Sequence, residues 1–314
     1  MLDRETRVAY IKMHMAVVLL GLTAIFGEFI SFQALPLVWH RLWIAVLGLL
    51  FIPGIAIGIK KIEPKQILIF ASIGFVVGIH WICFYSSIKT GNVSIALASF
   101  STSTLFISIL EPIITKSKFQ WVEAFLGILV IVGLLLILDV GKLYYTSIIW
   151  GLLAAITSAF FSTLNKRYIG HYNVLSISLI QLAAAFLLIT VILGFKSNFN
   201  FSNYSIFNSS QISEHKLFGV YLHSFWYLLA LGLLCTSVAY VLAMSALKNL
   251  SAFSAGLAVN LEPVYGILMA IWFFSEHKSL PSTFYFGTAL ILLSVFLHPI
   301  ILRVQKRRNQ KKLL

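Results

Sequence analysis

The fold follows from two similar stretches of the chain, FYSSIKTGNVSIALASF at residues 84–100 and YVLAMSALKNLSAFSAGLA at residues 240–258. A second similar pair lies further along each half, WVEAFLGILVIVGLLLIL at 121–138 and STFYFGTALILLSVFL at 282–297. In each pair one stretch lies in the first half of the chain and the other in the second, and the two pairs occur in the same order in both halves. The sequence therefore predicts two copies of one structural unit.

Each copy consists of apolar runs bounded by charges or turn residues, and each run is long enough, or nearly so, to cross a hydrocarbon core of about 30 Å as a helix. The runs are 13–33, 36–59, 67–88, 92–114, 121–138, 148–168, 174–194, 223–247, 251–275 and 281–302. Five runs per copy is an odd number, so the second copy enters the membrane from the opposite side. We predict an all-α integral membrane protein with ten transmembrane helices in two inverted five-helix repeats, residues 13–138 and 148–302.

Composition excludes a water-soluble protein. Hydrophobic residues make up 60% of the 314-residue chain, charged residues make up 11%, and the mean hydropathy is +0.95. Soluble domains carry about 25% charged residues, so too little polar surface is present to cover a soluble globule. The net charge of +13 would suggest nucleic acid as a partner of a soluble protein, but here the positive charges flank membrane spans. We expect a lipid bilayer and no nucleic acid.

The distribution of Lys and Arg predicts the topology. If the N-terminus is cytoplasmic, most basic residues fall in cytoplasmic segments, including the basic tail at 303–314. Arg41 lies within a span, and the external segments hold only Lys89, Lys142, Lys196, Lys216 and Lys278. Positive charge favours the cytoplasmic side, so we predict a multi-pass protein of the cell (cytoplasmic) membrane with both termini cytoplasmic. The long connection at 195–222 is then an external loop, either a tolerated insertion or a partial lid over an outer vestibule.

Glu262 is the sharpest candidate for function. It lies near the middle of the ninth run, beside Asn260 and directly before Pro263, which cannot donate to the helical ladder. A charged group at the centre of a span costs about 2.5–3.5 kcal/mol on insertion scales. We hypothesise that Glu262 takes up and releases a proton or binds a substrate ammonium group, and that Asn260 orients it. The alternative is a structural carboxyl group at a helix kink.

Other polar side chains within spans are candidates for the route of a substrate. Glu28 and Arg41 flank a short turn at similar depth, which favours an ion pair that acts either as an outer gate or as a structural pair. His80, beside Trp81, is either a titrating group in a wet cavity or a packing residue. Four further residues could line a cavity or only join helices: Tyr85, Asn165, Gln181 and Tyr240. Glu111, close to Lys116, is expected to be a solvated residue at the membrane interface.

The sequence resembles the EamA family of the drug/metabolite transporter superfamily over nearly its whole length. The resemblance rests on Ala34-Leu-Pro-Leu-Val-Trp-His-Arg41 and Asn92-Val-Ser-Ile-Ala-Leu-Ala-Ser in the first half. In the second half it rests on Gly151-Leu-Leu-Ala-Ala-Ile-Thr-Ser-Ala and on Leu250-Ser-Ala-Phe-Ser-Ala-Gly-Leu-Ala-Val-Asn-Leu-Glu-Pro-Val. The family's first helix commonly carries Trp-Gly where this chain has Phe26-Gly27. The resemblance implies two EamA repeats and a carrier that exports small metabolites such as amino acids.

These observations predict a secondary active transporter that works by alternating access, in which Glu262 couples transport to protons. No enzyme is expected, because the sequence lacks HExxH, P-loop and GxSxG motifs. No metal or other cofactor is expected, since Cys83 and Cys235 are isolated in apolar runs. The expected partners are a small-molecule substrate and the bilayer, with a proton and a second copy of the chain as further candidates. The alternative function is that of a non-transporting membrane scaffold or lipid-handling protein.

Overall fold

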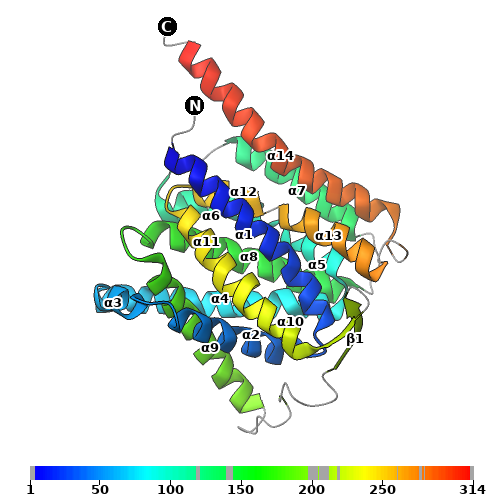
Figure 1. Cartoon of the computed structure of the whole chain (residues 1–314). Helices are drawn as coiled ribbons and strands as arrows, with labels where there is room; N and C mark the ends of the chain where they lie inside the picture. The colour runs from blue at the N-terminus through cyan, green and yellow to red at the C-terminus, as the bar shows by residue number, and fades with distance from the viewer. Residues whose placement is uncertain are drawn as a thin grey trace.

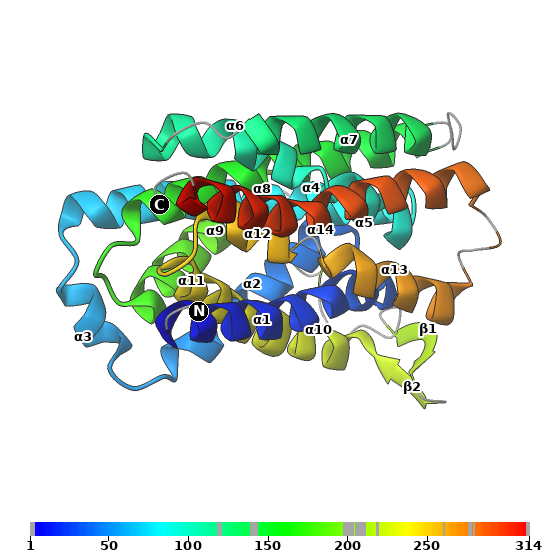
Figure 2. The ribbon, with the colours of Figure 1, turned by 90° about the horizontal axis from the view of Figure 1, so that it is seen from above.

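The structure is a computed structural model that describes residues 4–117, 121–138, 144–196, 204, 212–217, 220–259, 261–275, 278 and 280–311. The described chain forms a bundle of helices with one short hairpin (Figure 1). In the view of Figure 2, α6 and α7 lie along one side of the bundle, α1 and α10 lie along the other, and the hairpin projects from one end.

The helices and strands, in chain order, are α1 (Arg4–Phe29), α2 (Ala34–Leu50), α3 (Ile55–Lys60), α4 (Pro64–Thr90), α5 (Val93–Phe100), α6 (Ser103–Thr115), α7 (Trp121–Leu138), α8 (Tyr145–Tyr168), α9 (Val174–Lys196), β1 (Ile212–Leu217), β2 (Val220–His223), α10 (Ser224–Gly232), the π-helix η4 (Leu233–Val238), α11 (Ala239–Leu247), α12 (Ala252–Val259), α13 (Leu261–Phe274) and α14 (Ser282–Lys311). The antiparallel pair β1–β2 falls within the loop predicted between the seventh and eighth spans. We call the end of the bundle at which α1 begins the N-terminal end.

Seven helical segments of the described chain are long and apolar enough to cross a membrane. They are Arg4–Phe29, Pro64–Thr90, Val93–Thr115, Tyr145–Tyr168, Val174–Lys196, Ser224–Leu247 and Ala252–Phe274. Ala34–Leu50 and Ser282–Ser294 are shorter apolar helices, and they match the second and tenth predicted runs. The prediction of a helical, multi-pass membrane protein is confirmed at this level, and the count of ten spans stays a prediction.

The outer surface of the bundle is apolar, and polar side chains are buried among the apolar ones of its interior, as expected of a protein whose solvent is lipid. Large hydrophobic side chains such as Leu68, Leu187 and Trp272 are exposed on the outside. Buried Ser and Thr hydroxyls bond to carbonyl groups of their own helix, as Thr163 does to Ala159. Within the hydrocarbon region such bonds satisfy polar groups that no water can reach.

The two broken helices, α5–α6 and α12–α13, begin and end alike. Asn92 caps α5 by accepting a hydrogen bond from the backbone three residues on, and Ser251 does the same at the start of α12. Lys116 and Ser275, which follow the two broken helices, are the non-glycine residues of the described chain with positive φ. The same number of residues separates the two members of each pair, so local structure repeats between the halves of the chain.

The two broken helices also pack against each other reciprocally. A Cβ atom at Gly266 in α13 would overlap Leu97 in α5, and a Cβ atom at Gly256 in α12 would overlap Ile107 in α6. Leu97 corresponds to Gly256 and Ile107 corresponds to Gly266 by the same sequence spacing. The two contacts therefore join corresponding pairs of positions, as expected for a self-complementary interface, although both glycines lie in the second half and both inserted side chains in the first.

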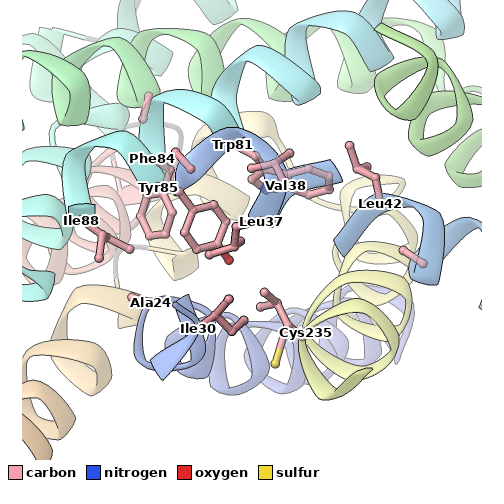
Figure 3. Close-up of a cluster of buried hydrophobic side chains, with 14 of the residues drawn as sticks. Ala24, Ile30, Leu37, Val38, Leu42, Trp81, Phe84, Tyr85, Ile88 and Cys235 are labelled. Atoms are coloured by element: carbon pink, nitrogen blue, oxygen red, sulfur yellow. The ribbon is translucent and has the colours of Figure 1, made fainter. Parts of the chain in front are cut away.

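The largest group of buried apolar residues joins α1, α2, α4 and η4. In Figure 3, Trp81, Phe84 and Tyr85 of α4 face Leu37 and Val38 of α2, with Ala24, Ile30, Leu42, Ile88 and Cys235 around them. Pro36 lies in the first turn of α2 and Pro64 begins α4, positions at which a missing N–H costs nothing. This core surrounds Arg41 and determines its orientation.

Candidate functional site

A cavity of about 930 Å³, part of it open to solvent, lies within the bundle. Helices of both halves line it, namely α1, α2, α4, α5, α6, α8, α11, α12 and α13. Its walls are mostly apolar and aromatic, with a few polar side chains among them, which is the usual composition of a small-molecule site. The lining runs from Arg41 and Phe84 to Met13 and Leu247, near the N-terminal end.

Arg41 is the fully buried cation of this cavity, with no accessible surface of its own. Its Nε donates to Thr236 Oγ1 at 2.6 Å, and its Nη1 donates to the Tyr85 hydroxyl at 3.0 Å. The guanidinium carbon lies 4.1 Å from the centre of the Trp81 ring, a cation–π contact. Nη2 donates to the Cys235 carbonyl at 3.3 Å. Three of five N–H groups are therefore used, and two are left for an anion.

The π-helix η4 supplies two partners of Arg41, the Thr236 hydroxyl and the Cys235 carbonyl. In a π-helix the backbone bonds reach one residue further than in an α-helix, and such segments frequently occur at functional sites. Thr236 uses its own proton on the Leu231 carbonyl at 2.7 Å, so its oxygen is free to accept from Arg41. Sequence reasoning missed Thr236 and Cys235. The only sequence signal was the polar pair Thr236-Ser237 inside an apolar run.

Glu262 also lines the cavity, in the first turn of α13, and is only 4% exposed. In the described chain no hydrogen bond or salt bridge reaches its carboxyl group, although it is close enough to Arg41 for the two charges to interact. Ser103 lines the cavity at the corresponding place in the first turn of α6. The two chain breaks thus bring an acid and a hydroxyl group to the same cavity.

His80 and Trp81 lie in the cavity wall, as their positions in the sequence suggested. The Nδ1 atom of His80 is 2.9 Å from the Ala154 carbonyl, which can only accept, so Nδ1 carries the proton. The rings of Phe84, Phe100 and Phe161 surround the imidazole, with centroid distances of 6.2, 5.5 and 5.3 Å. This orientation leaves Nε2 as the atom that can meet a ligand.

Asn165, Gln181 and Tyr240 form one hydrogen-bonded network. Tyr240 donates to the amide oxygen of Gln181 at 2.5 Å, and the Gln181 amide nitrogen donates to Asn165 Oδ1 at 2.6 Å. Asn165 and Tyr240 line the cavity, whereas Gln181 is fully buried behind them. Tyr85 likewise lies outside the lining and supports Arg41.

Two predictions about charged residues are wrong, and the first is the pairing of Glu28 with Arg41. The carboxylate of Glu28 lies 3.9 Å from the Lys89 ammonium, and Arg41 has other partners. Lys89 also donates to the Ile30 carbonyl at 2.8 Å, so this pair lies at the end opposite the N-terminal end. Glu28 is therefore not part of the cavity. Asn260 lies outside the described residues.

The second wrong prediction concerns Glu111, which is not the solvated interfacial residue that was expected. It is only 8% exposed, and its carboxylate accepts hydrogen bonds from the backbone N–H groups of Ala252 at 2.9 Å and Phe253 at 2.6 Å. It therefore caps α12, whose first N–H groups have no partner within the helix. A carboxylate of α6 thus holds a helix of the other half of the chain in place.

An aromatic cluster closes the end opposite the N-terminal end. Phe29 stacks on Tyr227 at a centroid distance of 5.2 Å and contacts Phe273 and Phe274 at 5.7 and 5.3 Å. Phe29 and Tyr227 are almost completely buried. At the N-terminal end, charged side chains bond to backbone carbonyls instead, as Lys166 does to Leu247 at 3.0 Å.

Sequence reasoning also missed the small polar side chains of the lining, chiefly Ser103, Ser158 and Ser162. Serine is common in membrane helices, so sequence alone does not separate these serines from packing residues. The described residues contain no group of three or more His, Cys, Asp and Glu side chains that could hold a metal ion. The cavity is suited to binding a small molecule. It offers that molecule one cation, Arg41, one acid, Glu262, and several neutral polar groups.

A model of the EamA-like transporter family matches residues 7–139 and 145–298, nearly the whole chain in two copies. The chain belongs to the EamA-like transporter family. The resemblance noted in the sequence, and with it membership of the drug/metabolite transporter superfamily, is thereby confirmed. Members of the EamA-like family are transporters and not enzymes, so a small-molecule substrate and a lipid bilayer are the partners that membership implies.

Known proteins similar to this EamA-like chain leave its substrate open. A protein of Bacillus subtilis (strain 168) named "Uncharacterized transporter YxxF" is 23% identical over 276 residues, which cover 85% of this chain and 82% of that protein. One protein crystal structure has the same fold, with a TM-score of 0.65 at 13% identity over 95% of this chain and 98% of that one. The identity of the substrate has to be argued from the cavity.

Proposed function

We propose that this protein is a secondary active transporter that exports a small zwitterionic metabolite, such as an amino acid, across the cell membrane by alternating access. The observation that carries the proposal is the pair Arg41 and Glu262. Both are buried, both line one cavity, and no salt bridge joins them. Buried charges without a partner of opposite charge are costly, so a site that keeps two of opposite sign apart is suited to a ligand that carries both signs.

The roles of the two residues follow from their geometry. Arg41 has two free N–H groups in a fixed fork, which matches the two oxygens of a carboxylate. Glu262 would accept the ammonium group of the same molecule, or a proton when the cavity is empty. Exchange of these two occupants at one carboxyl group would couple export to proton entry. The predicted role of Asn260, to orient Glu262, belongs to this proposal.

Alternating access is supported by the reciprocal contacts of α5–α6 with α12–α13. The contact of Leu97 with Gly266 and the contact of Ile107 with Gly256 join corresponding pairs of positions, which is the relation expected of two inverted repeats that form two similar gates around one site. With ten spans and both termini cytoplasmic, the cavity leads toward the cytoplasm and the aromatic cluster around Phe29 closes the outer side. The structure then corresponds to the inward-facing state of the cycle, ready to load a cytoplasmic metabolite.

The test is flux of a mixed pool of labelled amino acids from sealed proteoliposomes, with and without an imposed pH gradient. We expect flux to follow the gradient in the native protein and to lose that dependence in Glu262→Gln. Glu262→Ser, which makes the position equal to its counterpart in the first half, should lower flux at least 100-fold. Ser103→Ala should lower it only a few-fold, since it removes a neutral group.

Arg41 provides a second readout in the same vesicles. Arg41→Gln removes the carboxylate partner and should raise the half-saturating concentration of every zwitterion in the pool. If no amino acid moves, or if flux survives Arg41→Gln and Glu262→Ser unchanged, the zwitterion proposal is wrong. Cysteine labelling would then separate a different carrier from a membrane scaffold: Ser162→Cys reacts with a hydrophilic maleimide only if water reaches the cavity. The native Cys83 and Cys235 are buried and give little background.

A further inference from the structure

One wall of the cavity carries a row of neutral polar groups. Ser158, Ser162 and Asn165 lie on α8 at positions i, i+4 and i+7, and all three line the cavity. Residues at this spacing share one face of a helix. The row runs from the middle of α8 toward its end at Tyr168, away from Arg41 in α2 and toward the N-terminal end.

The donors of these three residues make no hydrogen bond within the described chain. In the described chain the hydroxyls of Ser158 and Ser162 make no hydrogen bond, and the amide nitrogen of Asn165 is buried without a partner. Other hydroxyls of the same helix are satisfied: Thr157 bonds to the Leu153 carbonyl at 2.7 Å, and Thr163 bonds to Ala159 at 2.8 Å. A buried polar group without a partner costs free energy. Ser158, Ser162 and Asn165, which carry such groups on α8, all line the cavity, where a ligand could supply the missing partner.

Asn165 is held in place from behind. Gln181 donates to its amide oxygen at 2.6 Å, and Tyr240 in turn fixes Gln181 at 2.5 Å. The network uses the oxygen of Asn165, and its NH₂ group, which lies close to the Tyr240 hydroxyl, makes no hydrogen bond of normal geometry in the described chain. Asn165 is only 1% exposed, so its free donor is a fixed group in a dry wall. A donor held in this way discriminates strongly against a ligand that cannot accept its hydrogen bond.

The facing wall is apolar, with Met13 and Leu20 of α1 and Met244 and Leu247 of α11. The ionisable side chains of the described lining are Arg41, His80, Tyr240 and Glu262. The row on α8 itself therefore offers hydrogen bonds but no charge. It suits an uncharged polar group better than a carboxylate or an ammonium group, which would be desolvated there without a counter-charge.

We propose that Ser158, Ser162 and Asn165 form a second subsite, which binds an uncharged hydrogen-bonding group on the side chain of the zwitterion. The substrate then carries a hydroxyl or carboxamide group at the end of a short chain, in place of a purely apolar or a charged side chain. The proposal rests on the proposed function, because Arg41 and Glu262 hold the other end of the same molecule.

Three zwitterions of nearly equal size test it: L-glutamine, its apolar isostere L-homoleucine, and its charged isostere L-glutamate. Binding to the purified protein in nanodiscs can be followed by isothermal titration calorimetry. We expect glutamine to bind at least tenfold more tightly than homoleucine and glutamate. The double variant Ser158→Ala/Ser162→Ala should weaken glutamine binding about 25-fold, since each of the two lost hydrogen bonds is worth about fivefold. Its affinity for homoleucine should be unchanged, which shows that the variant is folded.

Thr157→Val is the matched control. It removes a hydroxyl from the same helix that does not line the cavity, and it should leave both affinities unchanged. The subsite is wrong if homoleucine or glutamate binds native protein as tightly as glutamine does, or if the double serine variant weakens both ligands equally. If those ligands still lose affinity in Arg41→Gln, the proposed function stands without the subsite. If none of the three binds native protein, the zwitterion proposal and the subsite fall together.

Discussion

The broken helices α5–α6 and α12–α13 occupy corresponding places in the two halves, yet they differ in chemistry. Their local caps, Asn92 and Ser251, and their ends, Lys116 and Ser275, lie at corresponding positions, and so do the two contacts that join them. At the chain break that faces the cavity, however, the first half presents Ser103 and the second half presents Glu262. The positions of the contacts are shared between the halves, whereas at this chain break only the second half carries an ionisable group.

The difference separates two functions of the same pair of helices. Symmetric packing gives two states of similar energy, one open at each end, which a carrier needs in order to alternate. A symmetric charge distribution would give two equal half-sites and no defined orientation for a small ligand. One arginine from α2 and one acid from α13 define a single orientation. We therefore expect changes at shared positions to alter stability equally, and changes at the unshared positions to act unequally.

The largest effect on stability is expected at the caps, where the correspondence breaks down. Asn92 caps α5 from within its own segment, whereas α12 also receives the buried carboxylate of Glu111. Hydrogen bonds to charged acceptors are worth about 1.5–3 kcal/mol each, and removing Glu111 leaves two N–H groups without it. We expect Glu111→Ala to lower the free energy of unfolding by about 3 kcal/mol, against about 1 kcal/mol for Asn92→Ala.

Unfolding in mixed micelles, followed by circular dichroism, measures both changes. Glu111→Gln keeps one acceptor and should lie between the native protein and Glu111→Ala. Equal losses for Glu111→Ala and Asn92→Ala would mean that the interhelical cap adds nothing, and that the two broken helices are equivalent in energy as well as in shape.

A smaller effect, equal at the two positions, is expected at Gly256 and Gly266, the glycines of the second half that face Ile107 and Leu97 of the first. Gly256→Ala and Gly266→Ala each place a methyl group against Ile107 or Leu97, and overpacking of this kind costs about 1–3 kcal/mol. The two variants should lose the same stability within about 0.5 kcal/mol. Ile107→Ala and Leu97→Ala should each reduce the added cost of the glycine change that they face, as a double-mutant cycle would show.

Flux should not follow the same equality. Gly256 and Ile107 line the cavity, whereas Gly266 and Leu97 do not belong to its described lining. Gly256→Ala is therefore expected to reduce transport more than Gly266→Ala at equal stability. If the two variants differ in their free energy of unfolding instead, the two corresponding contacts do not contribute equally to stability.

The apolar runs predicted which polar residues lie within helices of the bundle, but not the direction of their side chains around the helix axis. They placed Glu262 near the middle of the ninth run and Arg41 a few residues into the second, and both residues line the cavity. The same reasoning put Glu28 and Arg41 at one depth, yet they point to different neighbours and Glu28 contacts Lys89. Glu111 failed for a related reason, because its partners in α12 lie 141 and 142 residues away. Partners so far apart in the sequence depend on how the helices pack against each other, and the apolar pattern of a single helix does not reveal that packing.

The smallest effect is expected at two corresponding lysines, Lys89 and Lys248. They are separated by as many residues as the two caps, Asn92 and Ser251. Each donates to a carbonyl in the loop after the first helix of its own half, Lys89 to Ile30 at 2.8 Å and Lys248 to Tyr172 at 2.6 Å. Lys89 has the carboxylate of Glu28 as well, 3.9 Å away. Lys248 lies just outside its span, and burial lowers the pKa of its ammonium group, so the folded protein holds that proton less tightly than the unfolded chain does.

It follows that neutral replacements at these two sites should differ in cost. A lowered lysine pKa means that the charge itself destabilises the fold, and Lys248→Gln relieves that cost while it loses one hydrogen bond. We expect a net change near zero for Lys248→Gln and a loss of about 0.5–1 kcal/mol for Lys89→Gln, since partly exposed ion pairs contribute little. Lys89→Gln and Glu28→Gln should be non-additive in unfolding measurements, with the double variant no worse than either single one. Additive losses would show that the ion pair of Lys89 with Glu28 does not stabilise the fold. The two halves would then be alike at this position, and the buried acid of α13 would be their main difference in charge.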